Sequence, residues 1–114
     1  MIAVIFELQP HNDKAENYFE LARTLKPVLE SIDGFLSIER FESMVHPGKY
    51  LSLSFWRDEA SVEAWRNRAQ HRGAQSAGRA SIFENYRLRV AHVVRDYGLN
   101  ERAEAPMDSR EVHG

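Results

Sequence analysis

Residues 82–97 read IFENYRLRVAHVVRDY, and no other stretch of the chain decides as much about its fold. Side chains alternate along it, with Tyr86, Leu88 and Val90 on one side and polar residues such as Arg87 on the other. A period of two residues predicts a β-strand. This strand would be far longer than the usual ~5–6 residues, so its end overhangs its own sheet. An overhanging edge needs a partner, and we predict that a second copy of the chain supplies it in a homodimer.

Two elements are predicted at the start of the chain. The alternation of apolar and polar residues over residues 2–9 predicts a first strand. Between residues 14 and 32 the apolar positions recur with the 3.6-residue period of an amphipathic helix. We expect Asn12 or Asp13 to cap the start of this helix, and Gly34 to end it with left-handed backbone.

The middle of the chain reads as a hairpin followed by a second helix. Residues 35–44 and 50–56 alternate as strands, and the turn composition between them joins them in a hairpin. Three apolar residues of the second of these strands are expected to face inward: Leu51, Leu53 and Phe55. Three others are expected on the opposite face: Ser52, Ser54 and Trp56. The spacing of Val62 and Trp65 then predicts a helix with an apolar face.

The order β-α-β-β-α-β predicts a ferredoxin-like α+β fold, with an antiparallel sheet and both helices on one of its faces. The other face of the sheet also carries apolar residues, and a second sheet lying against it would cover them. We expect residues 1–98 to form one domain. Residues 99–114 form a polar tail, either a mobile arm or a segment that lies across the other subunit.

The composition excludes several classes of protein. The chain has 114 residues, of which 43% are apolar and 28% charged, as in one globular domain. Its 15 Lys and Arg against 17 Asp and Glu give a formal charge of -2, whereas nucleic-acid-binding proteins carry a basic excess. It has no cysteine, which excludes disulfides and thiolate nucleophiles. It has neither a run approaching the ~20 apolar residues that cross a bilayer nor a signal-peptide pattern, so we expect a cytoplasmic protein without membrane contact.

Common catalytic motifs are absent from the sequence. It contains no G-x-S-x-G nucleophile elbow, no P-loop and no G-x-G-x-x-G. The five histidines are scattered, and no two of them lie four residues apart. The sequence therefore predicts no metal site and no built-in cofactor.

Short motifs spread over the chain carry a resemblance to a known family. They are Asp33-Gly34-Phe35, Phe55-Trp56 followed by Glu59-Ala60-Ser61-Val62-Glu63-Ala64-Trp65, then His71, and finally Tyr86 with Arg95-Asp96-Tyr97-Gly98. In these motifs the chain resembles the antibiotic biosynthesis monooxygenase family, and the resemblance covers nearly its whole length. It implies a homodimer whose two sheets form a dimeric α+β barrel, with a pocket in each subunit between sheet and helices.

The resemblance also implies chemistry, because some members of that family oxidise aromatic compounds with O₂ and use neither metal nor flavin. Our first hypothesis is a cofactor-independent monooxygenase that acts on a small aromatic or quinoid compound. His71 and Trp65 are the predicted catalytic residues, with the imidazole as the base that makes the substrate anion reactive toward O₂. Four residues are predicted to bind the substrate: Phe6, Phe41, Arg79 and Tyr86.

Two alternatives stay open. Other members of the family bind and degrade haem, and here His71 would be the axial ligand. The third hypothesis is a non-catalytic dimer that binds a small apolar molecule. Each site residue also has a plainer interpretation: Trp65 as core, His71 as a helix-end residue, and Arg79 in a surface ion pair.

Overall fold

The computed structural model describes residues 1–71 and 81–114, with only the backbone described for residues 69–71. Its elements in chain order are β1 (Ile2–Pro10), α1 (Ala15–Glu30), β2 (Phe35–Glu42), β3 (Tyr50–Trp56), α2 (Glu59–His71), β4 (Phe83–His92) and α4 (Met107–His113). The predicted order β-α-β-β-α-β is confirmed, and a short C-terminal helix follows it. No helix in the described part of the chain is long and apolar enough to span a membrane.

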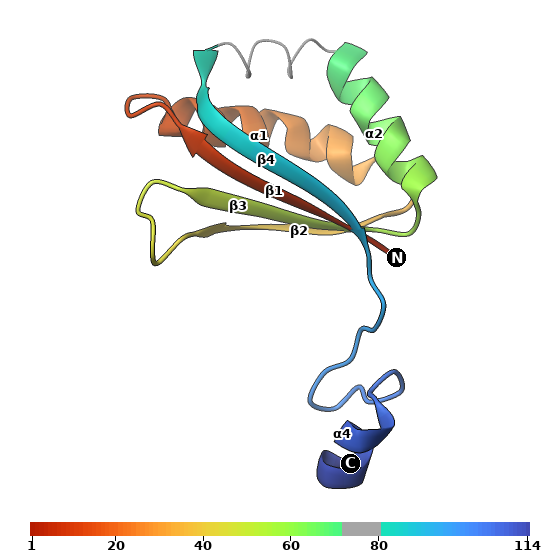
Figure 1. Ribbon diagram of the computed structural model, residues 1–114. Helices are drawn as coiled ribbons and strands as arrows, with labels where there is room; N and C mark the ends of the chain where they lie inside the picture. Colours follow the sequence, from red (N-terminus) through yellow and green to blue (C-terminus); the bar gives the residue numbers. More distant parts are fainter. Residues whose placement is uncertain (72–80) are drawn as a thin grey trace.

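The sheet has the strand order β2-β3-β1-β4, and every neighbouring pair is antiparallel. β1 lies between β3 and β4, so that Phe6 of β1 stands opposite Ser52 on one side and Leu88 on the other. Helices α1 and α2 both cover the same face of this sheet (Figure 1). This is the predicted ferredoxin-like arrangement, and its other face carries no helix.

The start of α1 differs from the prediction. The helix begins at Ala15 after Lys14, and no side chain caps its first turn. Neither Asn12 nor Asp13 is the cap, because the Lys14 amide donates to the His11 carbonyl at 2.9 Å in a turn that precedes the helix. The expectation at the other end holds in part: Gly34 has a φ of +94°, but it lies beyond the helix, whose last turn closes at Ser31.

The last strand is shorter than predicted. β4 ends at His92 instead of Tyr97, because its antiparallel partner β1 begins opposite that residue. Ile2, the first residue of β1, stands opposite His92, and the Val93 amide makes the last bond to the Met1 carbonyl at 3.0 Å. The alternation of side chains continues in the sequence after His92, but β1 has no residue left to pair with that part of the chain. The overhang is therefore present as unpaired chain (Figure 1).

The tail is more ordered than a polar arm. Residues 107–113 form α4, which the sequence reading did not predict. Arg102 ties this segment together, since its Nε donates to the Gly114 carbonyl at 2.8 Å and its terminal nitrogen donates to Ser109 Oγ at 2.7 Å. Its guanidinium also lies over the ring of Tyr97, 5.2 Å from the centroid. The tail is a small structured unit that extends away from the sheet (Figure 1).

The facing of β3 is the reverse of the prediction. Ser52, Ser54 and Trp56 are buried under the helices, whereas the three apolar residues between them are only half-buried on the helix-free face: Leu51, Leu53 and Phe55. The prediction placed the more apolar set inward. It was wrong because both faces of this strand carry apolar residues, and the indole of Trp56 outweighs the two serines that share its side.

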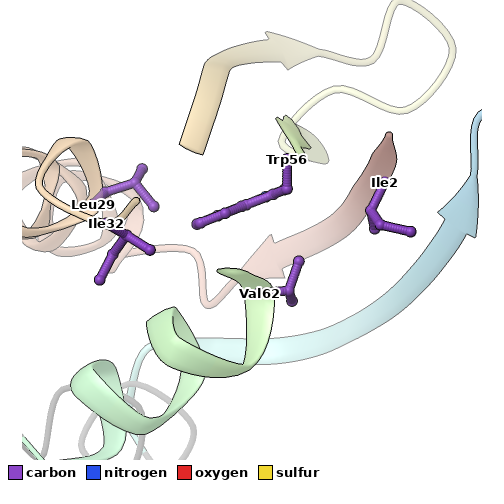
Figure 2. Close-up of a cluster of buried hydrophobic side chains, with 5 residues drawn as sticks. All are labelled: Ile2, Leu29, Ile32, Trp56 and Val62. Atoms are coloured by element: carbon purple, nitrogen blue, oxygen red, sulfur yellow. The ribbon is translucent and has the colours of Figure 1, made fainter. Parts of the chain in front are cut away.

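A tryptophan at the end of β3 organises the core. The Trp56 side chain is 1% exposed and packs in a cluster with Ile2, Leu29, Ile32 and Val62. Figure 2 shows these side chains converging from β1, the end of α1, β3 and the start of α2. The indole Nε1 donates to Ser54 Oγ at 2.9 Å, which satisfies the one polar atom of the buried ring. The end of α1 and the start of α2 are thereby fixed to the same end of the sheet.

Gly34 lies where the chain after α1 comes close to the start of α2. Its carbonyl accepts a hydrogen bond from the Arg57 amide at 2.7 Å. A Cβ at this position would clash with the hydroxyl of Ser61 in α2, which is itself held by Asp58 at 2.7 Å. Position 34 therefore requires glycine for two reasons, its positive φ and the close approach of α2.

The two reasons can be separated by comparing Gly34 with Gly48. Gly48 has a similar φ of +86°, but a Cβ there would meet nothing within 4 Å. We expect Gly48→Ala to lower the free energy of unfolding by about 1 kcal/mol, the cost of left-handed backbone. Gly34→Ala should cost about 2–4 kcal/mol, because overpacking adds to that strain. Urea denaturation measures both, and equal losses would contradict the close approach of α2.

Candidate functional site

A cavity of about 250 Å³ lies between the sheet and the two helices. Its walls are mostly apolar and come from every element of the main domain. The sheet contributes Val4, Phe6, Ile38, Trp56, Phe83, Tyr86, Leu88 and Val90, and the helices contribute Tyr18, Leu21, Leu25, Leu29, Val62 and Trp65. A concave, apolar space of this kind with a few polar groups is the usual form of a small-molecule site.

Three of the predicted site residues lie on this wall, namely Phe6, Trp65 and Tyr86. Trp65 is half-buried and also packs against the Trp56 cluster, so it serves the core and the cavity together. The structure thus brings these three side chains to one space, and their roles in chemistry stay predictions.

Phe41 does not belong to the cavity. Its neighbour Arg40 lines the cavity, and because successive residues of a strand point to opposite faces, Phe41 lies on the helix-free face, where it is 43% exposed. Its prediction as a substrate-binding residue is corrected on this ground. The position on β2 that the prediction gave to Phe41 is held by Arg40.

His71 and Arg79 are not tested in the same way. His71 is the last residue of α2, six residues after Trp65, and its side chain lies outside the described part of the structure. Arg79 lies outside the described residues altogether. Their predicted roles as base, haem ligand or substrate contact remain predictions.

Aromatic rings line one end of the cavity. The ring centroid of Phe6 lies 5.7 Å from that of Phe83 and 5.6 Å from that of Tyr86, both in edge-on contact. Tyr18 of α1 completes the group, 5.8 Å from Phe83. Such rings offer faces and edges to a planar ligand. Tyr18 and Phe83 were missed from the sequence, although Tyr18 stood on the apolar face of the predicted helix and Phe83 was the second residue of the predicted last strand.

The polar groups of the cavity come from the sheet. Arg40 lies beside Ser52, its partner in the register of β2 and β3, and both line the cavity together with Ser54. The Nε of Arg40 donates to the hydroxyl of Tyr18 at 3.2 Å. Sequence reasoning missed these residues, but the alternation of β2 contained a signal: Arg40 shares a strand face with the apolar Ile38.

An ionic cluster fixes α2, which carries Trp65, to the preceding loop. Asp58 caps the helix, since its Oδ1 accepts from the Ser61 amide at 2.9 Å and from the Ser61 hydroxyl at 2.7 Å. Arg57 bridges the two acids, at 3.0 Å from Asp58 and 3.1 Å from Asp33. The hydrogen bonds from Ser61 and then Arg57 lower the pKa of Asp58 to about 2. The pKa of Arg57 is raised by its bonds to Asp33 and Asp58.

The family model for antibiotic biosynthesis monooxygenases matches residues 1–77, which run from β1 past the end of α2. The chain belongs to the antibiotic biosynthesis monooxygenase family. The family suggested by the sequence motifs is therefore confirmed.

Two curated proteins are clearly related to this member of the family. It is 45% identical over 113 residues to a jasmonate monooxygenase of Pyricularia oryzae, covering 97% of this chain but 52% of that protein. The chain thus spans about half the length of that relative. It is also 31% identical over 94 residues to YqjZ, an uncharacterised protein of Bacillus subtilis, covering 82% of this chain and 79% of YqjZ.

Solved structures show the same fold. Rv0793 from Mycobacterium tuberculosis matches with a TM-score of 0.74 at 15% identity, covering 85% of this chain and 98% of that one. SnoaB, a cofactor-independent oxygenase from Streptomyces nogalater, matches with a TM-score of 0.70 at 12% identity, covering 83% and 94%. At these identities the likeness establishes the ferredoxin-like fold of the family and nothing finer.

The lowered pKa of Asp58 predicts a specific acid sensitivity. Because the folded-state pKa lies below the unfolded value, the charged carboxylate stabilises the fold above about pH 4, and this contribution is lost as the pH falls from about 4 to about 2. Asp58→Asn keeps a side chain that caps helices but does not titrate. Urea denaturation between pH 5 and pH 2 should therefore give a shallower loss of stability for Asp58→Asn than for the parent. Identical slopes would contradict the capping role of the ionised Asp58.

Proposed function

We propose that this protein is a cofactor-independent monooxygenase that acts on a small aromatic or quinoid compound bound between the sheet and the helices. One observation carries the proposal, the cavity of about 250 Å³ with apolar and aromatic walls. Its volume lies just below the range for small-molecule pockets, roughly 300–1,000 Å³, which suits a compact ring system. Membership of the family supports an oxygenase, and a relative at 45% identity is named for the oxidation of a small cyclic compound, jasmonate.

The chemistry requires no cofactor when the substrate supplies its own electrons. A methylene between aromatic rings, next to a ring hydroxyl or carbonyl, can lose a proton to a base and give a delocalised anion. The anion transfers electrons to O₂. One oxygen atom then enters the substrate as a carbonyl and the other leaves as water, so that the four electrons lost by the methylene are the four that O₂ accepts. The protein has to position the substrate, remove the proton and exclude water.

Within this proposal His71 is the base and Trp65 and Phe6 are walls against which the ring system lies. Tyr86 belongs to the same wall, and Arg79 is retained as a contact to a substrate oxygen. Imidazole suits the role of base because its pKa lies near neutral pH. Trp65 suits the role of wall because its large ring is half-buried at the cavity and fixed from behind by the core.

Oxygen consumption with hydroquinone and anthrone substrates tests the proposal. We expect turnover by the parent and a loss of about 100-fold or more in His71→Ala, the usual contribution of a general base. Trp65→Phe should mainly raise KM, because it removes part of the wall. Glu63→Gln is the matched control, since Glu63 is an exposed residue of the same helix. If His71→Ala and Trp65→Phe turn over as fast as the parent, the proposed site is wrong.

We also propose that the protein works as a homodimer whose two sheets pack face to face. The helix-free face carries Ile5, Leu51, Leu53 and Phe55 only half-buried. The chain has a radius of gyration of 16.5 Å, whereas a compact domain of this length has about 13 Å. The difference reflects the tail, which extends away from its own sheet (Figure 1). A partner subunit would cover the exposed face and give the tail a surface to lie on.

Sedimentation equilibrium tests the dimer. The parent should sediment as a dimer at micromolar concentration, and Leu53→Arg should shift it to monomer, because a charge would be buried in the middle of the apolar face. Glu16→Arg is the control, since Glu16 is exposed on α1 and lies on the opposite side of the sheet. A parent that is monomeric at micromolar concentration would overturn this part of the proposal.

A further inference from the structure

The charged side chains that line the cavity are positive, whereas the whole chain has a negative net charge. The whole chain has a formal charge of -2, yet the cavity is lined by Lys26, Arg40 and Arg66 and by no aspartate or glutamate among the described residues. Lys26 and Arg66 are exposed and Arg40 is half-buried, so Arg40 is the cation whose attraction for an anion is least screened by water. The cavity therefore favours an anionic ligand.

Arg40 is the cation placed among the sheet residues of the cavity. Among the described residues, its Nε alone has a partner, the neutral hydroxyl of Tyr18 at 3.2 Å, and the guanidinium lies 5.9 Å from the centroid of the same ring. None of the ion pairs formed by the described residues includes Arg40. The acid on the same face of β2, Glu42, accepts from the Gly48 amide in the hairpin turn instead. No residue in the described ranges occupies the two terminal nitrogens of Arg40, so they are available to a ligand.

A buried serine stands opposite Arg40 on the neighbouring strand. Ser52 is directly opposite Arg40 in the register of β2 and β3, lines the cavity and is 7% exposed. Its hydroxyl makes no hydrogen bond with any residue in the described ranges, although buried polar groups are normally paired. Side chains directly opposite on one sheet face have Cβ atoms about 5 Å apart. One carboxylate can therefore contact both the Ser52 hydroxyl and the Arg40 guanidinium.

We propose that Arg40 and Ser52 form an anchor for the carboxylate, or a comparable acidic oxygen, of an otherwise apolar ring-bearing substrate. Guanidinium binds carboxylate through two parallel charge-assisted bonds, which fixes the orientation of the ligand as well as its affinity. The ring of the substrate then lies toward the apolar walls, including Trp65 and Phe6. This inference rests on the proposed function, which it deepens by naming the substrate class as apolar carboxylic acids.

Binding of matched acids and esters tests the anchor without requiring turnover. The probes are 1-naphthoic acid and jasmonic acid, each compared with its neutral methyl ester, by calorimetry and by quenching of the fluorescence of Trp56 and Trp65. The parent should bind the acids about tenfold or more tightly than the esters, as expected for charge-assisted hydrogen bonds. In Arg40→Gln this preference should disappear while the affinity for the esters stays within about twofold.

Control variants separate direct contact from general charge. Arg23→Gln removes one positive charge from an exposed position of α1 outside the cavity, and it should keep the preference for acids. Ser52→Ala should lose part of that preference with unchanged ester binding, which also shows that the cavity is intact. The proposal is overturned if the parent binds acids no better than esters, if it binds neither, or if Arg40→Gln retains the preference.

The failure of the anchor and the failure of the oxygenase proposal give different results. A preference for acids that depends on Arg40, together with no oxygen consumption on any probe, would contradict the monooxygenase and leave the anchor standing. Turnover of neutral hydroquinones that depends on His71, without a preference for acids, would contradict the anchor and leave the oxygenase standing.

Discussion

The packing of Trp56 is the interaction on which the rest of the structure depends. Its indole needs cover on all sides, and the end of α1 and the start of α2 supply that cover through Leu29, Ile32 and Val62. Because both helices are held at this end of the sheet, they diverge beyond it (Figure 1). The space between the diverging helices and the sheet is the cavity. Trp56 is thus a core residue whose packing holds the helices around the cavity. Trp65, in the helix α2 that follows β3, forms part of the cavity wall.

Local patterns predicted the elements well because each strand and helix follows its own period. They failed where the outcome depends on a partner. β4 stops at His92 because the first residue of β1, Ile2, lies opposite it. Nothing in the alternation of residues 82–97 records where β1 begins. The reversal of β3 has a similar cause: a sheet with two apolar faces gives two acceptable choices, and only the position of the helices decides between them. α4 was missed because its seven residues are mostly polar and are ordered by Arg102.

The site was predicted in outline. Phe6, Trp65 and Tyr86 line one cavity because each belongs to an apolar face whose period was clear, and their roles in binding or chemistry stay predictions. Phe41 was predicted to bind substrate, but the face of β2 that turns toward the helices is the one that carries Ile38 and Arg40. An arginine is by default a surface residue in an ion pair. The position of Arg40 opposite the buried Ser52 could therefore be recognised only from the strand register and the burial. The proposed anchor is therefore argued from tertiary structure and not from the sequence pattern.

The central claim is that the ligand site lies between the helices and the sheet and not on the helix-free face. Methyl NMR spectra of the protein, selectively labelled at leucine and valine and titrated with 1-naphthoic acid, test it most directly. The account predicts shifts at the methyl groups that line the cavity, in Leu21, Leu25, Val62 and Val90, with little change at Leu51 and Leu53 on the other face. Shifts confined to Leu51 and Leu53, with Leu21 and Val62 unmoved, would contradict it.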